Sequence, residues 1–121
     1  MSRTALATLL GGLVLGLLLA SPAAAAPVKL TGTVGPGHTI QLRQNGKQVT
    51  RLKAGVAYRI VVSDRADDHD FRIVGPRLNR AITGVEFMGT KSVVVTFRAG
   101  AYRFYCAPHA DEMRGSFRVV R

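Results

Sequence analysis

The chain has 121 residues, with 17 basic and 7 acidic side chains and a formal net charge of +10. Its length fits one domain, and its hydrophobic share of 47% excludes a disordered polyelectrolyte. The single cysteine, Cys106, excludes an internal disulfide and two-cysteine redox chemistry.

The N-terminus has the residue order of a secretory signal peptide. One charge, Arg3, precedes an apolar run from Ala5 to Ala20, and a stretch of small residues follows. We expect residues 1–25 to be a cleaved signal peptide, which leaves a domain of residues 26–121 with a net charge of +9. An uncleaved membrane anchor is the alternative, although this apolar run is short for a membrane span. The protein is therefore expected to be exported, to the periplasm, the cell envelope or the medium.

The remaining chain has the pattern of short β-strands. Apolar and polar residues alternate in short runs, which Gly, Pro and Asn residues separate, as in half-buried strands joined by turns. No stretch keeps a helical period for three turns, and only residues 77–83 are compatible with one helical turn. Seven or eight such strands predict an all-β Greek-key sandwich. In chain order, the expected strands are residues 28–31, 39–43, 49–52, 56–62, 71–74, 92–97, 102–106 and 116–120.

Three side chains with metal-binding atoms lie close together near the C-terminus: Cys106, His109 and Met113. They fall in the loop between the last two expected strands, and a loop of this length can turn all three toward one point. Thiolate and thioether are soft ligands and imidazole is intermediate, a mixture that selects copper over magnesium, calcium or manganese. A trigonal copper site of two histidines and one cysteine, with a long methionine bond, needs a second histidine. His69 is the best candidate.

Four segments of the chain match a known sequence pattern: Asp68-His69-Asp70-Phe71, Gly75-Pro76, residues 100–109 and residues 113–117. Together they resemble the plastocyanin/azurin family of cupredoxins. The resemblance implies a cupredoxin-like sandwich that holds one type 1 (blue) copper ion, which cycles between Cu(I) and Cu(II) and transfers one electron. The implied copper ligands are His69, Cys106, His109 and, in the axial position, Met113.

The chain also departs from that family at two places. Three residues separate His109 from Met113, where plastocyanin-like loops have four and amicyanin-like loops two. Asp70 follows the first histidine, where plastocyanin-like proteins usually carry asparagine. The alternatives without a metal are a buried, inert Cys106 and an ordinary loop histidine at position 69. His38, between a glycine and a threonine, is expected to be a surface turn residue and not a ligand.

The sequence therefore predicts a small exported electron carrier. The same ligands also suit an extracytoplasmic copper-sequestering or copper-delivery protein, and a third alternative is an adhesion module that has lost copper. We do not expect an independent enzyme, because the sequence offers no nucleophile–base pair and no second set of metal ligands.

Acidic residues are concentrated near the expected ligands. Two interpretations are open: acidic residues commonly occupy loops, or the molecule is polarised and meets its partner under salt-sensitive electrostatic steering. We expect the partner to be a redox protein of the cell envelope, with weak contacts to anionic surface polymers or lipids, no nucleic-acid binding, and a monomeric carrier. Six of the seven acids belong to this group: Asp64, Asp67, Asp68, Asp70, Asp111 and Glu112.

Overall fold

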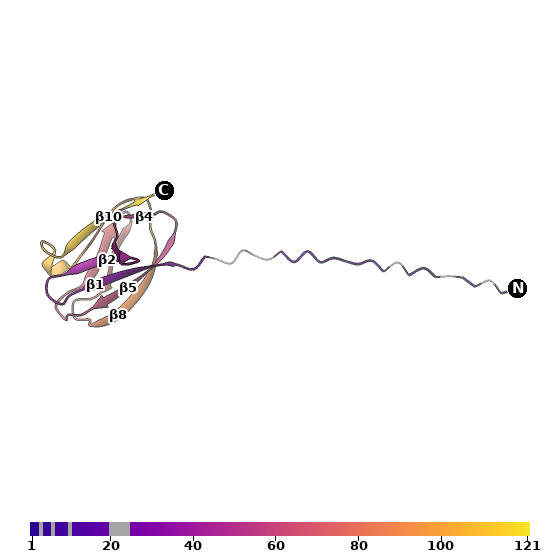
Figure 1. The fold of residues 1–121 in the computed structure, drawn as a ribbon, viewed down its shortest axis with the longest axis horizontal. Helices are drawn as coiled ribbons and strands as arrows, with labels where there is room; N and C mark the ends of the chain where they lie inside the picture. Colours follow the sequence, from indigo (N-terminus) through magenta and orange to yellow (C-terminus); the bar gives the residue numbers. More distant parts are fainter. Residues whose placement is uncertain (3, 6, 10, 20–24) are drawn as a thin grey trace.

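The computed structural model describes residues 1–121 apart from residues 3, 6, 10 and 20–24, so part of the expected signal peptide lies outside the described residues. The described residues before Val28 form no helix or strand and extend away from the folded domain (Figure 1). Among the described residues, no helix is long and apolar enough to cross a membrane. Every strand that the structure describes lies between Val28 and Val120.

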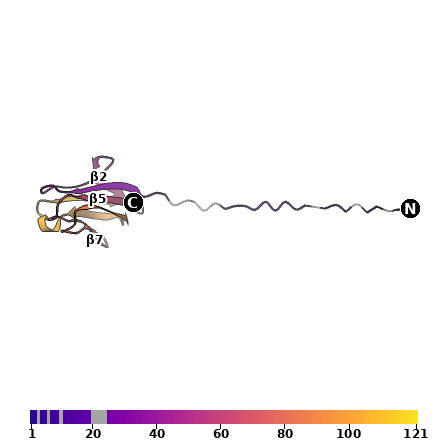
Figure 2. The same ribbon diagram turned by 90° about the horizontal axis from the view of Figure 1, so that it is seen from below.

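The described residues form two five-stranded sheets, which face each other as two layers (Figure 2). Two pairs of strands are parallel, β1 (Val28–Val34) with β5 (Ala57–Asp64) and β4 (Arg51–Lys53) with β10 (Arg114–Val120), and the other pairs are antiparallel. This arrangement confirms the predicted all-β sandwich. The first sheet has the order β3-β2-β1-β5-β8, with β1 (Val28–Val34), β2 (Ile40–Gln44), β3 (Lys47–Gln48), β5 (Ala57–Asp64) and β8 (Gly89–Thr96). The second has the order β4-β10-β9-β6-β7, with β4 (Arg51–Lys53), β6 (Phe71–Gly75), β7 (Leu78–Thr83), β9 (Gly100–Tyr105) and β10 (Arg114–Val120).

The core forms because successive side chains of a strand point to opposite faces of its sheet. On β9, Tyr102 and Phe104 are buried between the sheets, whereas Arg103 between them is exposed. The Tyr102 ring stacks on that of Phe117 from β10, with centroids 5.3 Å apart. These aromatic contacts fix the position of β9, which leads directly to Cys106.

Two glycines of the second sheet leave space for these rings. A Cβ atom at Gly75 would lie 2.2 Å from the Tyr102 ring, and one at Gly115 would lie 2.2 Å from the Phe104 ring. Any larger residue at either position would overlap an aromatic side chain of the core.

Two segments differ from the sequence-based expectation. Residues 77–83, compatible with a helical turn, contain β7 instead, because the chain reverses after Gly75 and pairs antiparallel with β6. Residues 49–52 were expected to form one strand, but they cross between the sheets. The Val49 amide donates to the Leu42 carbonyl of the first sheet at 2.9 Å, whereas Leu52 pairs with Val119 of the second.

Candidate metal centre

Two loops at one end of the sandwich carry the expected ligands. Cys106 directly follows β9, and a short 3-10 helix, η1 (Ala107–His109), begins after it. His69 lies just before β6, which is the neighbour of β9 in the same sheet. The sheet order therefore brings His69 next to residues almost forty positions later in the chain.

Backbone hydrogen bonds hold the loop from Cys106 to Met113 in a closed turn. The Cys106 amide donates to the Met113 carbonyl at 3.0 Å, so the two ends of the loop are tied together. The His109 amide donates to the Cys106 carbonyl at 3.1 Å, and the Met113 amide donates to the His109 carbonyl at 2.8 Å. Three of the expected ligand residues are thus linked through their own backbones.

The three nitrogen and sulfur donors converge on one point. The Nδ1 atoms of His69 and His109 are 3.1 Å apart, and the Cys106 Sγ lies 3.7 Å from the first and 3.6 Å from the second. His69 and Cys106 are buried, whereas His109 is partly exposed. Three donor atoms at these separations could hold one metal ion, at a site with one edge near solvent.

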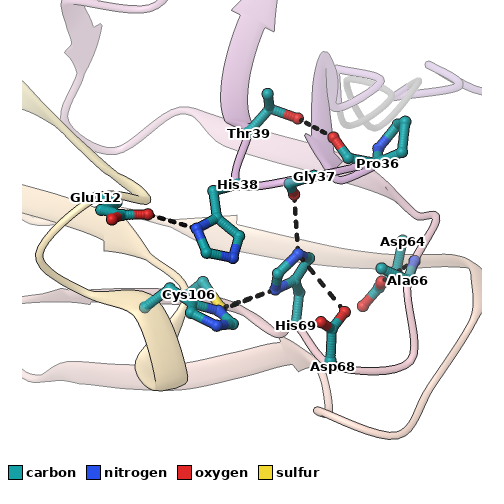
Figure 3. Close-up of polar contacts among 11 residues, drawn as sticks. Pro36, Gly37, His38, Thr39, Asp64, Ala66, Asp68, His69, Cys106 and Glu112 are labelled. Carbon is teal, nitrogen blue, oxygen red and sulfur yellow. Dashed lines mark hydrogen bonds and ion pairs between the residues drawn. The ribbon is translucent and has the colours of Figure 1, made fainter.

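A backbone carbonyl orients the His69 ring. His69 Nε2 lies 2.8 Å from the Gly37 carbonyl oxygen in the loop between β1 and β2, so this nitrogen donates its proton (Figure 3). The neutral ring then has its free lone pair on Nδ1, the atom that faces His109 and Cys106. The Gly37 contact therefore selects the tautomer that can bind a metal at the cluster.

The Cys106 sulfur is held in surroundings that disfavour a free thiolate. Burial raises the pKa of this thiol above its ordinary value, and backbone hydrogen bonds from Asp70 and His109 offset this only in part. A bound cation reverses that preference, because a coordinated thiol is deprotonated. The site thus favours a neutral thiol in the free protein and a thiolate when a metal is present.

Asp70 ties the two ligand loops together. Its Oδ1 oxygen accepts a 2.6 Å hydrogen bond from the Ala107 amide, which directly follows Cys106. The Asp70 side chain is buried, and its Oδ2 lies 3.9 Å from Arg72 Nε. The carboxylate therefore provides the acceptor for this link, at the position where plastocyanin-like proteins usually carry asparagine.

Met113, at the end of the loop that begins at Cys106, is completely buried in the hydrophobic core. Its backbone bonds to both Cys106 and His109 keep it at the same end of the sandwich as the other three expected ligands. The axial role of its sulfur stays a prediction.

His38 is the part of this site that the sequence analysis missed. It lies in an exposed loop, as expected, but its ring contacts those of His69 and His109, with centroid separations of 5.6 and 4.2 Å. Its Nδ1 also pairs with the Glu112 carboxylate, from the ligand loop (Figure 3). The only sequence signal for this contact was that His38 is one of three histidines in the chain.

The donor set fits a small metal ion of the soft or borderline type. Bonds of roughly 2.0–2.1 Å to imidazole nitrogen and about 2.3 Å to thiolate sulfur, at trigonal angles, would place the nitrogens ~3.5 Å apart and each nitrogen ~3.8 Å from the sulfur. The observed separations of 3.1, 3.6 and 3.7 Å are close to these values. Two imidazoles and one thiolate in a trigonal set are the donors of blue-copper sites.

Comparison with known proteins gives the fold. No protein-family profile and no curated protein sequence matches the chain. A reduced rusticyanin matches in structure with a TM-score of 0.59 and 19% identity, over 80% of this chain and 81% of that chain. Rusticyanin from Thiobacillus ferrooxidans matches with a TM-score of 0.58 and 16% identity, over 80% and 79%. Rusticyanin is a copper protein.

A multi-copper oxidase from Pediococcus acidilactici matches with a TM-score of 0.51 and 18% identity. The match covers 84% of this chain but only 29% of the oxidase, so the likeness in fold is confined to one part of that longer chain. The two-layer sandwich, the cluster of His69, Cys106 and His109, and the likeness to rusticyanin together identify the chain as a protein of the cupredoxin fold.

Proposed function

We propose that this protein is an exported type 1 copper protein that carries single electrons. The observation that supports this most strongly is the cluster of His69 Nδ1, His109 Nδ1 and Cys106 Sγ, whose separations are close to those expected around one metal ion. Copper bound there would supply a one-electron couple, Cu(I)/Cu(II). The basis for copper is the soft donor set and the structural likeness to a copper protein.

The residues of the site limit how far it rearranges between oxidation states. The Gly37 carbonyl orients the His69 ring, the Asp70 carboxylate holds the loop after Cys106, and backbone hydrogen bonds close that loop. Ligands that are fixed before and after an electron arrives contribute little to the reorganisation energy of the transfer. A rigid site therefore favours a carrier over a protein that must open to release its metal.

His109 offers the electron a way to the surface. The His109 ring is partly exposed, whereas the side chains of His69 and Cys106 are buried. Proline at position 108 has no amide proton to donate to the Cys106 sulfur. Fewer donors to sulfur leave it more electron-rich and lower the reduction potential.

The proposed export rests on the N-terminal residue pattern. The chain begins with one positive charge, an apolar run and small residues, the order of a cleavable signal peptide. The proposal places the domain of residues 26–121 outside the cytoplasm, where it carries electrons between other proteins and does not act as an enzyme.

Reconstitution with copper tests the proposal. We expect the protein with Cu(II) to bind one ion per chain and to show an intense blue thiolate-to-copper charge-transfer band. Cys106→Ala should abolish the band, whereas Met113→Leu should keep it and shift the reduction potential, because the axial ligand tunes the potential. A protein that stays colourless and binds no copper would overturn both electron transfer and copper storage.

Copper sequestration or delivery uses the same ligands, and two measurements separate it from electron transfer. A carrier should lose copper slowly to a strong chelator and give a reversible one-electron voltammogram. Rapid transfer of copper to the chelator, with poorly reversible voltammetry, would instead assign the site to metal storage or delivery.

A further inference from the structure

The outer face of the second sheet carries an excess of positive charge, and of its arginines Arg72 alone has an acidic side chain of residues 25–121 in a salt bridge, that of Asp70 at 3.9 Å. Its five strands, β4, β6, β7, β9 and β10, contain no aspartate or glutamate. Five arginines occupy positions that alternate with buried core residues and therefore point away from the core. We call this surface the arginine face, formed by Arg51, Arg72, Arg103, Arg114 and Arg118.

Tyr105 lies within the arginine face, next to the metal centre. In the sheet register it is paired with Arg114 of β10 on one side and with Arg72 of β6 on the other. The Arg103 guanidinium, two residues earlier on the same face, lies 5.9 Å from the centroid of the Tyr105 ring. Three arginines thus surround one half-buried tyrosine whose peptide bond leads directly to Cys106.

The surface is hollowed at this point. A groove of about 580 Å³ lies beside Tyr105 and has Arg103, Arg114 and Ser116 in its walls. Residues 25–121 supply no acidic side chain in a salt bridge with Arg103 or Arg114. Like charges placed side by side on a sheet destabilise it. The stability of the sheet therefore does not explain why these arginines lie together without acidic partners.

We propose that the arginine face, centred on the groove at Tyr105, is the docking surface for an acidic protein, the redox partner of this carrier. Guanidinium groups bind carboxylates with two parallel hydrogen bonds, and the tyrosine ring adds an apolar contact of the kind enriched in protein interfaces. A concave groove next to Cys106 suits the side chains of a folded partner better than the flat surface of a bilayer. The proposal rests on the electron-carrier function.

The charges around His109 favour the arginine face over the exposed ligand as the point of contact. Asp68 and Glu112 have side-chain exposures of 65% and 58%, and Asp111 beside them is also exposed. These carboxylates repel an acidic partner from the end of the molecule that exposes His109. The partner is therefore attracted to the sheet face, where Tyr105 and the peptide bond to Cys106 give a short covalent route to the metal centre.

A peptide of six glutamates serves as the probe for docking. We expect the peptide to shift NMR resonances of Tyr105 and its neighbours in both metal-free and copper-loaded protein, with binding that weakens as salt is added. Arg103→Gln with Arg114→Gln should weaken binding roughly tenfold, the loss expected from two exposed charge pairs. The matched control is Lys29→Gln with Arg59→Gln, which removes the same charge from a cross-strand pair of exposed residues on the opposite sheet.

The comparison of the two double variants shows whether binding is specific to the arginine face. Selective weakening by the Arg103 and Arg114 changes supports it. Equal weakening by both double variants, or resonance shifts centred on the opposite sheet, would show a non-specific charge effect and overturn it. Tighter binding to phosphatidylglycerol vesicles or duplex DNA than to the peptide, with the same resonance shifts, would also overturn it in favour of a lipid or nucleic-acid surface.

Electron transfer through the same surface is tested on the Cu(I) protein with two inorganic oxidants of opposite charge. Cu(I) loses one electron, and the Fe(III) of ferricyanide or the Co(III) of hexaamminecobalt gains it. We expect the Arg103 and Arg114 double variant to slow oxidation by ferricyanide several-fold at low salt, and oxidation by hexaamminecobalt not to slow. A rate with ferricyanide equal to that of the Lys29 and Arg59 control would contradict electron entry here.

The failure of this proposal is distinguishable from failure of the proposed function. A protein that binds no copper would refute electron transfer, and peptide binding to the metal-free protein would then assign the arginine face to an acidic ligand that is not a redox partner. A protein with a blue, reversible copper site and no preference for the peptide would keep the carrier function and refute this docking surface.

Discussion

The imidazole ring of His38 lies over that of His109, with ring centroids 4.2 Å apart and planes inclined by 33°. His38 belongs to the loop between β1 and β2, whereas His109 belongs to the loop between β9 and β10. The Glu112 carboxylate pairs with His38 and holds its ring in place. The partly exposed candidate ligand is therefore covered by a residue from a loop of the other sheet, which restricts the access of water to the candidate metal centre.

Removal of this cover should change the reduction potential of the copper-loaded protein. We expect His38→Ala to lower it, because water near the site stabilises the more highly charged Cu(II) state. The shift should be smaller than the ~59 mV that corresponds to a tenfold change in a one-electron equilibrium. His38→Phe, which keeps a ring over His109, is the control and should stay close to the unmodified protein in voltammetry. Equal shifts in the two variants would show that the ring does not act as a cover.

The link between Asp70 and Ala107 should contribute to stability even without metal. Asp70→Ala leaves the Ala107 amide without its buried acceptor, so we expect the free energy of unfolding to fall by about 1–3 kcal/mol. Asp70→Asn keeps a side-chain oxygen as the acceptor and should cost less. Urea unfolding of the metal-free variants measures both values, and equal losses would argue that the charge of Asp70, and not its hydrogen bond, stabilises the loops.

Asp64 should make stability depend on pH. Burial raises the pKa of this carboxyl group above its ordinary value, and its hydrogen bonds, including one from the Ala66 amide at 3.3 Å, offset the effect only in part. The folded state therefore binds this proton more tightly than the unfolded state does. The resulting stabilisation is complete below the unfolded pKa of 3.8 and is lost as pH rises through the folded pKa.

Asp64→Asn removes the buried charge and tests this dependence. We expect the variant to be more stable than the unmodified protein at pH 7 by on the order of 1 kcal/mol, the desolvation penalty of a buried polar group. The advantage should shrink toward pH 4, where the carboxyl group is protonated. Thermal unfolding of the metal-free proteins across this pH range gives the comparison, and a constant difference would refute the linkage.

Gly75 should be intolerant of any side chain. Its added methyl group would meet the Tyr102 ring at 2.2 Å, so Gly75→Ala should lower the free energy of unfolding by about 1–3 kcal/mol or more. Gly84→Ala is the matched control, because its added methyl has no neighbour within 4 Å and its change should stay within ~0.5 kcal/mol. Denaturant unfolding that ranks the two variants equally would contradict the packing argument.

Alternation of apolar and polar residues was enough to predict most strands and the class of fold. That pattern is local, because each residue's direction from a sheet follows from its neighbours in sequence. The same local rule failed at residues 77–83, which form β7. Their strand conformation depends on hydrogen bonds to β6, and no pattern within seven residues encodes a partner strand.

The sequence also indicated the candidate ligands Cys106, His109 and Met113, because they lie within one loop. Their residue types restrict the metal class wherever the loop lies in the fold. The position of His69 beside them, by contrast, depends on the adjacency of β6 and β9.

Only the tertiary structure placed the residues that surround this ligand set. His38 covers His109, Asp70 supports the loop after Cys106, and arginines from two neighbouring strands flank Tyr105. Each of these relationships joins residues more than eight positions apart in the chain, so it depends on strand order and register. The sequence by itself determined which atoms are available to bind a metal, and the packing of the two sheets decided which of them meet, because a side chain's distant neighbours are set by the fold and not by its local pattern.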